Sequence, residues 1–333
     1  MGPERARLSV VIPVYRDEHS IRDNFLSVKD ALEQSGRPFD FEIILVNDGS
    51  PDNSLLVLEG IHREFPHIAG IVTLKRNFGQ VAAILAGIAC ASGDCVSVIS
   101  SDLQDPPELI ATMFDLWRQG NHTVLAVREG RDDRLLDRLT SRVFYRLMKH
   151  YALAALPEDG FDFFLLDRAV VDTVLASRER NGFLQGQILS ASGTCAQIRY
   201  TRRRRRAGRS GWTFAKKLKY FIDAFAAYSF APIRFIAALG VLLFAAGVLS
   251  SIGLIVQRVV YGTRSVGWSS IMIAMLLLHG TEMLMLAVIG EYLWRTLDQV
   301  RDRPLYLIDY RKLPASSPLR ATEPLISIRP TTA

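Results

Sequence analysis

Polar side chains that could bind phosphate groups follow several apolar stretches of the sequence. Asp102 and Gln104 stand at alternate positions just after the apolar run 95–99. A carboxylate and an amide oxygen at this spacing can hold a divalent cation against a diphosphate, where the cation neutralises charge on a leaving group. The alternative is helix capping by aspartate, because Asp-Pro-Pro-Glu at 105–108 resembles a helix start.

Two more candidate sites each have a functional and a structural interpretation. Asp48 follows the apolar run 41–46 and precedes a Gly-Ser-Pro turn. It could hydrogen-bond a base or ribose, or it could cap the next helix. Arg128 and Arg131 follow another apolar run. Arginine suits bidentate contacts with phosphate, but both residues could also lie on the solvated face of an arginine-rich helix.

Strand and helix patterns that could position these side chains alternate over the first 100 residues. Strands are predicted at 8–14, 41–46, 68–74 and 95–99, and helices at 18–35, 52–65 and 79–91. This alternation predicts an α/β fold with a doubly wound, mostly parallel sheet. Ligands bind such sheets outside the carboxyl ends of the strands, which is where the polar residues are expected to meet.

Two common phosphate-binding motifs are missing from the sequence. No Gly-x-Gly-x-x-Gly follows the first predicted strand, and no Gly-x-x-x-x-Gly-Lys-Ser/Thr is present. An ordinary dinucleotide fold and a P-loop are therefore not expected. A bound nucleotide would have its phosphates neutralised by a metal ion instead of a glycine-rich loop.

Charge is unevenly distributed along the 333 residues. Residues 1–200 hold 21 basic and 27 acidic side chains, whereas residues 201–333 hold 19 and 7. An acidic body joined to a basic, apolar tail indicates an anionic partner surface, either nucleic acid or membrane. The arginine run 202–206 has no interleaved aromatic residue. Attraction to anionic lipid is the simpler interpretation, so no nucleic-acid partner is expected.

The tail contains two long apolar stretches. Residues 235–257 include no charged side chain, and a helix needs roughly 20 such residues to cross a membrane. Transmembrane helices are therefore predicted at 233–257 and 266–291, after a basic amphipathic interfacial segment at 206–232. The alternative is a pair of buried core helices.

Basic residues on both flanks of this predicted hairpin indicate its orientation. By the positive-inside rule, a catalytic domain at 1–205 and a tail at 292–333 are expected on the cytoplasmic side. The predicted location is the inner (cytoplasmic) membrane, with two membrane passes. Within the second span, His279 and Glu282 are interpreted as polar groups that join helices, or as contacts to a lipid head group or a neighbouring subunit.

Several motifs together resemble family 2 glycosyltransferases. The motifs occur in the family's order and are Val-Ile-Pro-Val-Tyr (11–15), Val-Asn-Asp-Gly-Ser (46–50), Arg-Asn-Phe-Gly-Gln (76–80) and Asp-Leu-Gln-Asp-Pro-Pro-Glu (102–108). The resemblance extends over about residues 8–310, through further matches at 160–168, 179–181, 208–213, 216–223 and 290–293. The branch it resembles is the membrane-bound polyprenyl-phosphate glycosyltransferases, which include bactoprenol glucosyltransferases and dolichol-phosphate mannose synthases.

The resemblance implies a GT-A fold, a nucleotide-sugar donor, Mg²⁺ or Mn²⁺, a polyprenyl (undecaprenyl) phosphate acceptor and a homotetramer. UDP-glucose or a related UDP-sugar is the donor that the family favours. The implied nucleotide-sugar contacts are Pro13, Tyr15, Glu18, Asp48, Arg76 and Gln80. The implied metal ligands are Asp102 and Gln104. The implied acceptor-phosphate contacts are Arg128, Arg131, Arg209 and Ser210, and Asp162 faces the sugar. The catalytic set would be Asp102, Arg128, Arg131 and Asp162. Transfer would invert the anomeric centre.

One departure from the family pattern concerns the metal. Many relatives have aspartate where this chain has Ser100, so the metal would bind less tightly or keep more water. The departure leaves a non-catalytic membrane scaffold, or pseudoenzyme, as an alternative. A processive polysaccharide synthase is another, but those enzymes carry a Gln-x-x-Arg-Trp motif. None of the four tryptophans here follows an arginine.

Overall fold

The computed structural model describes residues 5–102, 104–128, 156–157, 160–177, 183–201, 231–261, 267–301 and 303–316. The described strands are β1 (Ala6–Val14), β2 (Phe39–Asn47), β3 (Ala69–Leu74), β4 (Cys95–Val98), β5 (Thr123–Arg128), β6 (Phe163–Asp167), β7 (Cys195–Tyr200) and β8 (Ile308–Lys312). The described helices are α1 (Ile21–Gln34), α2 (Ser54–Glu64), α3 (Gln80–Cys90), α4 (Leu109–Arg118), α6 (Arg168–Ser177), α7 (Leu184–Ala191), α9 (Ala231–Tyr261) and α10 (Trp268–Val300).

The strands form one mixed sheet in the order β7-β5-β6-β4-β1-β2-β3-β8. Strands β1, β2, β3 and β4 run parallel, as do β5 and β7, whereas β6 and β8 run antiparallel to their neighbours. The predicted α/β fold with a mostly parallel sheet is therefore confirmed. The four strands predicted from apolar runs correspond to β1–β4, with shifts of a few residues at their ends.

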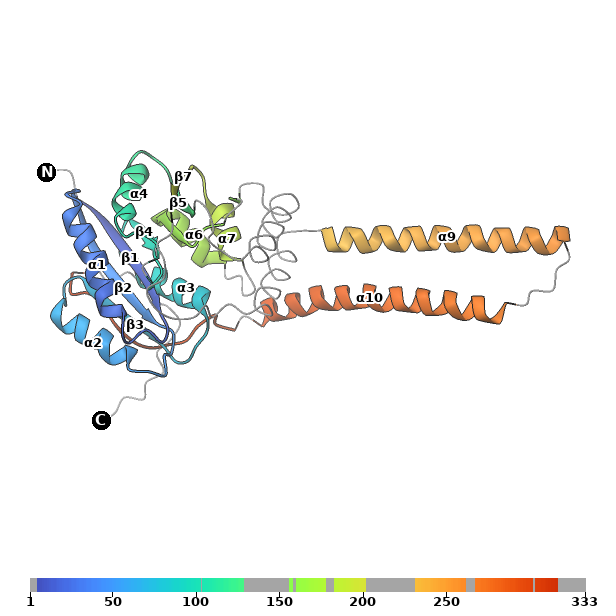
Figure 1. Ribbon diagram of the computed structural model, residues 1–333, viewed down its shortest axis with the longest axis horizontal. Coiled ribbons are helices and arrows are strands. Elements are labelled where there is room, and N and C mark those ends of the chain that lie inside the picture. The colour runs from blue at the N-terminus through green and yellow to red at the C-terminus, as the bar shows by residue number, and fades with distance from the viewer. Residues whose placement is uncertain are drawn as a thin grey trace.

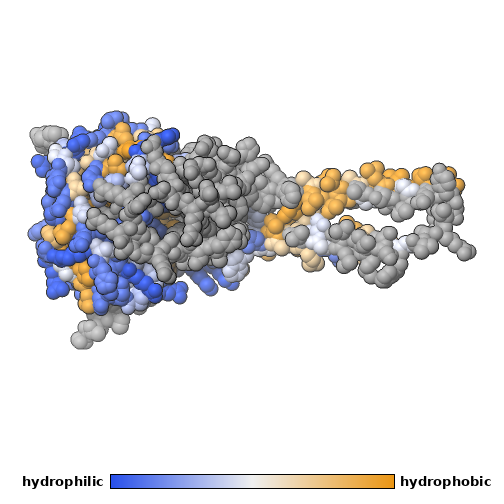
Figure 2. Space-filling model, in the orientation of Figure 1, coloured by the Kyte–Doolittle hydropathy of each residue, from blue (hydrophilic) through white to orange (hydrophobic). Residues whose placement is uncertain are grey.

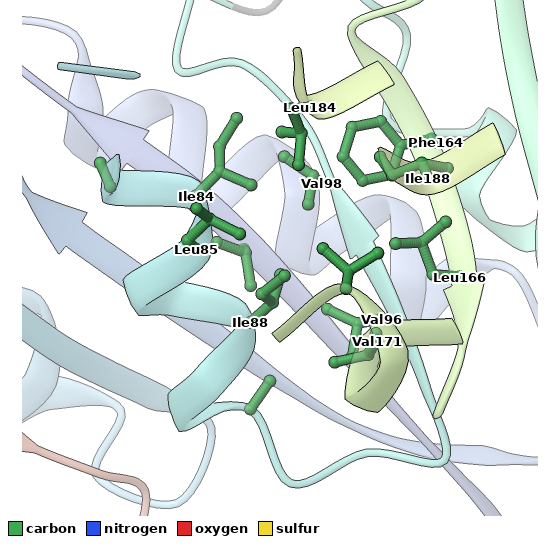
Figure 3. Packing of buried hydrophobic residues seen from close by; sticks show 14 of the residues in the cluster. Ile84, Leu85, Ile88, Val96, Val98, Phe164, Leu166, Val171, Leu184 and Ile188 are labelled. Atoms are coloured by element: carbon green, nitrogen blue, oxygen red, sulfur yellow. The ribbon is translucent and has the colours of Figure 1, made fainter. Parts of the chain in front are cut away.

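Apolar side chains cover both faces of the sheet. One core cluster includes residues of α1, α2 and α4, and the other includes residues of α3, α6 and α7. In the second cluster, Ile84 and Ile88 of α3 pack with Val96 of β4, Leu166 of β6 and Ile188 of α7 (Figure 3). Strands buried on both faces explain why the sequence shows continuous apolar runs instead of alternation.

Helix α3 lies unusually close to the sheet because of Gly87. A Cβ atom at this position would lie 2.3 Å from Val11 Cγ1 and 2.8 Å from Val46 Cγ2. Both distances are shorter than any van der Waals contact, so only glycine fits between α3 and strands β1 and β2. This close packing holds α3, which begins at Gln80, against β1 and β2.

Helices α9 and α10 extend side by side away from the sheet (Figure 1). The residues of this pair that Figure 2 colours are mostly apolar. In the part of the chain that the structure describes, no helix is both long enough and apolar enough to cross a membrane. The prediction of a multi-pass inner-membrane protein, made from the uncharged run 235–257, is therefore wrong. Charged and polar side chains lie along α10, among them His279, Glu282 and Glu291.

His279 and Glu282 are two of the ionisable residues of α10. His279 Nδ1 lies 3.1 Å from the carbonyl oxygen of Met275 on the same helix. The side chains of His279 and Glu282 are both exposed. The interpretation of His279 and Glu282 as polar groups that join helices stays a prediction. The predicted interfacial segment 206–232 lies outside the described residues except for its last two.

The chain returns to the sheet after α10, which the sequence analysis did not anticipate. Strand β8 pairs antiparallel with β3, from Ile71↔Lys312 to Leu74↔Ile308. Beyond β8, the Arg7 guanidinium donates to the carbonyl oxygen of Ser316 over 2.7 Å. Part of the segment expected as a tail at 292–333 is thus an edge strand of the sheet.

Candidate active site

The loops that follow β1, β2, β3 and β4 meet at one edge of the sheet. Parallel pairing requires this, because β1 and β2 align from Ala6↔Phe39 to Val14↔Asn47 and therefore end together. Four of the motifs, at 11–15, 46–50, 76–80 and 102–108, belong to these loops or to the strand and helix ends beside them. The residues predicted to bind the nucleotide sugar and the metal ion therefore lie at this edge, although they come from distant parts of the chain.

Asp48 holds three of these loops together. It is 3% exposed. Its Oδ1 accepts a hydrogen bond from the Phe78 amide at 2.7 Å, and its Oδ2 accepts one from the Gly79 amide at 2.9 Å. Its own amide donates to the carbonyl oxygen of Val14 at 2.9 Å. Burial raises the pKa of Asp48 above its ordinary value, although the two backbone donors act in the opposite direction.

Two interpretations of Asp48 were open. The helix-cap alternative is wrong, because the residue that precedes α2 is Asn53. The predicted contact of Asp48 with a base or ribose stays a prediction. Both carboxylate oxygens of Asp48 already accept hydrogen bonds from backbone amides.

Gly49 allows the loops after β2 and β3 to touch. Its φ is +58°, and a Cβ atom there would lie 2.4 Å from the carbonyl carbon of Arg76 and 2.7 Å from the amide nitrogen of Asn77. Alanine at this position would both adopt a left-handed backbone conformation and overlap fixed backbone atoms.

We therefore expect Gly49→Ala to lower the free energy of unfolding by about 2 kcal/mol or more, from backbone strain together with overpacking. Urea denaturation followed by circular dichroism measures this change. Gly60→Ala is the matched control, since Gly60 lies inside α2 and a Cβ atom added there would meet nothing within 4 Å. The control is expected to be neutral or slightly stabilising. Equal stability of the two variants would contradict the role assigned to Gly49.

Asp102 lies in the loop after β4, where neighbouring groups fix its carboxylate. Asp102 Oδ1 accepts hydrogen bonds from the hydroxyl of Ser100 and, at 3.3 Å, from the amide of Gln104. Asn24 Nδ2 donates to the carbonyl oxygen of Ser101, which ties this loop to α1. Ser100, where the family resemblance leads us to expect aspartate, therefore orients Asp102. Both Asp102 and Gln104 are half-buried.

A second carboxylate, Asp17, lies near Asp102. Burial raises the pKa of Asp17, hydrogen bonds from Ser20 and Ser101 act to lower it, and the charge of Asp102 raises it further. Asp17 Oδ2 is buried and has no hydrogen-bond partner among the described residues. Within those residues, no group of three or more His, Cys, Asp or Glu side chains is arranged to hold a metal ion.

Arg128 is the last residue of β5. Two partners, the Asp162 carboxylate and the Tyr200 hydroxyl, fix its guanidinium. Arg128 Nη2 donates to Asp162 Oδ2 over 2.7 Å, and Nε donates to the Tyr200 hydroxyl over 3.4 Å. The Arg128 side chain is 11% exposed, whereas that of Asp162 is 47% exposed. Burial alone would lower the pKa of Arg128, but the charges of Asp162 and Asp105 raise it above its ordinary value, so the guanidinium stays charged.

The structure joins Arg128 to Asp162, a contact that the sequence did not predict, and places Gln185, Tyr200 and Asp105 beside them. Gln185 Nε2 donates to Asp162 Oδ1 over 3.3 Å, and the Tyr200 hydroxyl donates to Asp105 Oδ1. The sequence analysis places Asp105 in the motif 102–108 and at a helix start, and predicts no contact with Tyr200. Tyr200 and Gln185 carry no local signal, since their partners lie far away in the sequence.

The other residues predicted to contact the nucleotide sugar lie at the same edge of the sheet. Pro13 is half-buried at the end of β1, and Tyr15 is exposed just beyond it. Glu18 Oε2 accepts a hydrogen bond from the Asn53 amide at 2.8 Å. The Arg76 guanidinium lies 5.0 Å from the centre of the Phe78 ring. The exposed Gln80 begins α3.

Three of the predicted acceptor contacts lie outside the described residues. They are Arg131, Arg209 and Ser210. Their roles, and those of the donor and metal residues, stay predictions.

We compared the sequence with models of known protein families to identify the class of protein that has this fold and these motifs. Residues 9–175 match the model of glycosyl transferase family 2. The chain belongs to this family and is a glycosyltransferase.

Individual relatives resemble nearly the whole chain. An uncharacterized glycosyltransferase of Bacillus subtilis, YkcC, is 34% identical over 90% of this chain and 92% of its own length. The bactoprenol glucosyl transferase of Shigella phage SfX is 31% identical over 92% of this chain and 100% of its own.

Solved structures resemble the chain more distantly. Glucosyl-3-phosphoglycerate synthase from Mycobacterium tuberculosis, in complex with Mn²⁺, uridine diphosphate and glucosyl-3-phosphoglycerate, is 18% identical. This match covers 66% of this chain and 79% of that one, with a TM-score of 0.46. Mannosyl-3-phosphoglycerate synthase from Rubrobacter xylanophilus is 17% identical over 71% and 75% of the two chains, with a TM-score of 0.46.

Proposed function

We propose that the protein transfers a sugar from a nucleotide sugar to a polyprenyl phosphate, with inversion at the anomeric carbon. UDP-glucose is the first donor to test. The relatives named bactoprenol glucosyl transferase support this acceptor, because they match over almost their whole length. A homo-oligomer, a tetramer by resemblance, belongs to the same proposal.

The observation that carries the proposal is the fixed guanidinium of Arg128. Arg128 ends β5, and β5 belongs to the same sheet as β4, which the Asp102 loop follows. The Arg128 side chain is largely buried and forms hydrogen bonds with both Asp162 and Tyr200. A guanidinium that is held in one orientation can bind two phosphate oxygens with little loss of side-chain entropy. An acceptor that reacts through a phosphate group needs such a residue.

The proposed transfer reaction does not need a strong general base. A lipid phosphate is already an anion at neutral pH, so it can attack the anomeric carbon without losing a proton. The protein must instead position two anionic substrates and offset their repulsion. Arg128 would orient the acceptor phosphate, and Asp162, partly exposed beside it, would face the sugar. Attack from the face opposite the leaving group gives inversion.

The residues present fit a divalent metal ion. Asp102 and Gln104 offer oxygen donors, and the Asp102 carboxylate is fixed by Ser100 and by the Gln104 amide. Mg²⁺ is commonly held by one or two carboxylates, with phosphate oxygens and water completing the shell. When bound, Mg²⁺ or Mn²⁺ would neutralise the charge that develops on the departing nucleoside diphosphate.

The test is transfer from radiolabelled nucleotide sugars to undecaprenyl phosphate in detergent, with Mg²⁺, with Mn²⁺ and with EDTA. Metal-dependent formation of a lipid-linked sugar from UDP-glucose or a related UDP-sugar is the expected result. Transfer to 3-phosphoglycerate in the same panel, without transfer to the lipid, would replace the proposed acceptor. Folded protein that transfers no sugar to any acceptor would overturn the proposal.

A further inference from the structure

A chain of side-chain hydrogen bonds connects the Asp102 loop with Arg128. Asp105, three residues after Asp102, accepts a hydrogen bond from the Tyr200 hydroxyl, and that hydroxyl accepts one from Arg128 Nε. Asp105 is fully buried and Tyr200 nearly so. The chain therefore joins the loop that would bind the donor to the arginine that would bind the acceptor.

Strand pairing places Tyr200 beside Arg128. The parallel pairing of β5 with β7 runs from Thr123↔Cys195 to Arg128↔Tyr200, so the two residues end neighbouring strands in register. The Tyr200 ring also packs edge-on against Phe163 of β6, with 6.3 Å between ring centres. The phenol is thus held in place by the sheet and brings its hydroxyl to Arg128.

The protonation of Tyr200 suits this role. Burial raises the pKa of Tyr200, and the nearby charge of Asp105 raises it further, although the charge of Arg128 acts in the opposite direction. The phenol therefore stays protonated at neutral pH. A neutral hydroxyl can donate to Asp105 and accept from Arg128 simultaneously.

We infer that Tyr200 and Asp105 are positioning residues that fix the Arg128 guanidinium for the acceptor phosphate. This inference rests on the proposed function. The ion-pair partner of Arg128, Asp162, is half-exposed and also accepts a hydrogen bond from Gln185. Asp162 alone is a weaker restraint, because an exposed ion pair competes with water. Tyr200 supplies the buried contact that keeps the arginine from rotating.

The test compares Tyr200→Phe with the full-length wild-type protein. Phenylalanine keeps the packing against Phe163 and removes only the hydroxyl. We expect the KM for undecaprenyl phosphate to rise about tenfold, while kcat and the KM for the nucleotide sugar change much less. Asp105→Asn, which retains an acceptor oxygen, is expected to show a smaller rise.

A second readout does not depend on activity. Phenylglyoxal modification of Arg128, followed by peptide mass spectrometry, reports how freely the guanidinium moves. We expect faster modification in Tyr200→Phe than in wild type, and no change in Tyr310→Phe, a matched variant in β8 at the opposite edge of the sheet.

The two proposals fail in different ways. An unchanged rate of Arg128 modification in folded Tyr200→Phe overturns the positioning role, whether or not the protein transfers sugar to the lipid. An unchanged KM for undecaprenyl phosphate in an active Tyr200→Phe protein also overturns it. A wild-type protein that transfers no sugar to the lipid overturns the proposed function, even where the modification rates differ.

Discussion

Replacing Asp102 by asparagine is expected to lower the rate of sugar transfer by about 10²–10³-fold at saturating metal. Asparagine keeps the size of the side chain and an oxygen that can accept the hydrogen bonds from Ser100 and Gln104. Only the negative charge is lost, and with it the attraction for a divalent cation. The loss should be largest at low Mg²⁺, so a titration with Mg²⁺ separates weaker metal binding from misfolding.

Asp94→Asn is the matched control for this variant. Asp94 precedes β4 at the end of the strand opposite Asp102, is exposed, and accepts a hydrogen bond from the Arg7 amide at 2.9 Å. Its replacement should leave both the transfer rate and the Mg²⁺ dependence unchanged. If Asp102→Asn transfers sugar at the wild-type rate over the whole titration, the metal assignment is incorrect.

The second large effect is expected at Arg128. Arg128→Lys should reduce kcat/KM for the acceptor by about 10²-fold, and Arg128→Ala by more. Lysine keeps the positive charge but lacks the planar fork that reaches Asp162 and Tyr200 simultaneously. The KM for the nucleotide sugar should change little, because the predicted donor contacts lie in other loops.

Arg37→Lys provides the comparison for an exposed arginine. Arg37 Nε and Nη2 bind the Asp115 carboxylate at 3.0 and 2.7 Å, far from the carboxyl ends of the parallel strands. Exposed ion pairs contribute little, so its replacement should affect neither stability nor transfer measurably. An Arg128→Lys protein with normal acceptor kinetics would remove the main support for a phosphate acceptor.

The central strands were predictable because their signal is local. Strands β1 to β4 are four to nine residues long and mostly buried, and a largely apolar run marks each of them in the sequence. Their common direction then places the ends of four loops at one edge. The convergence of Asp48 and Asp102 there follows from strand direction and needs no knowledge of side-chain contacts.

The missed features all depend on pairing between distant residues. Tyr200 and Asp105 are separated by 95 positions, and β8 pairs with a strand more than 230 residues earlier. Neither pairing leaves a periodic pattern that a single sequence can show. The membrane prediction failed for a different reason. It rested on counting uncharged residues in a segment, which does not by itself determine what the folded helix presents to its surroundings.

Strand β8 also affects how readily the protein could aggregate. Its partner β3 lies inside the sheet only because β8 covers it. Cleavage within residues 303–307 would release β8 and turn β3 into an exposed edge, with free backbone donors and acceptors along the buried, mostly apolar residues 71–74. Such an edge is a template for β-strands of other molecules. The short strand β8 thus protects β3 from pairing with other molecules.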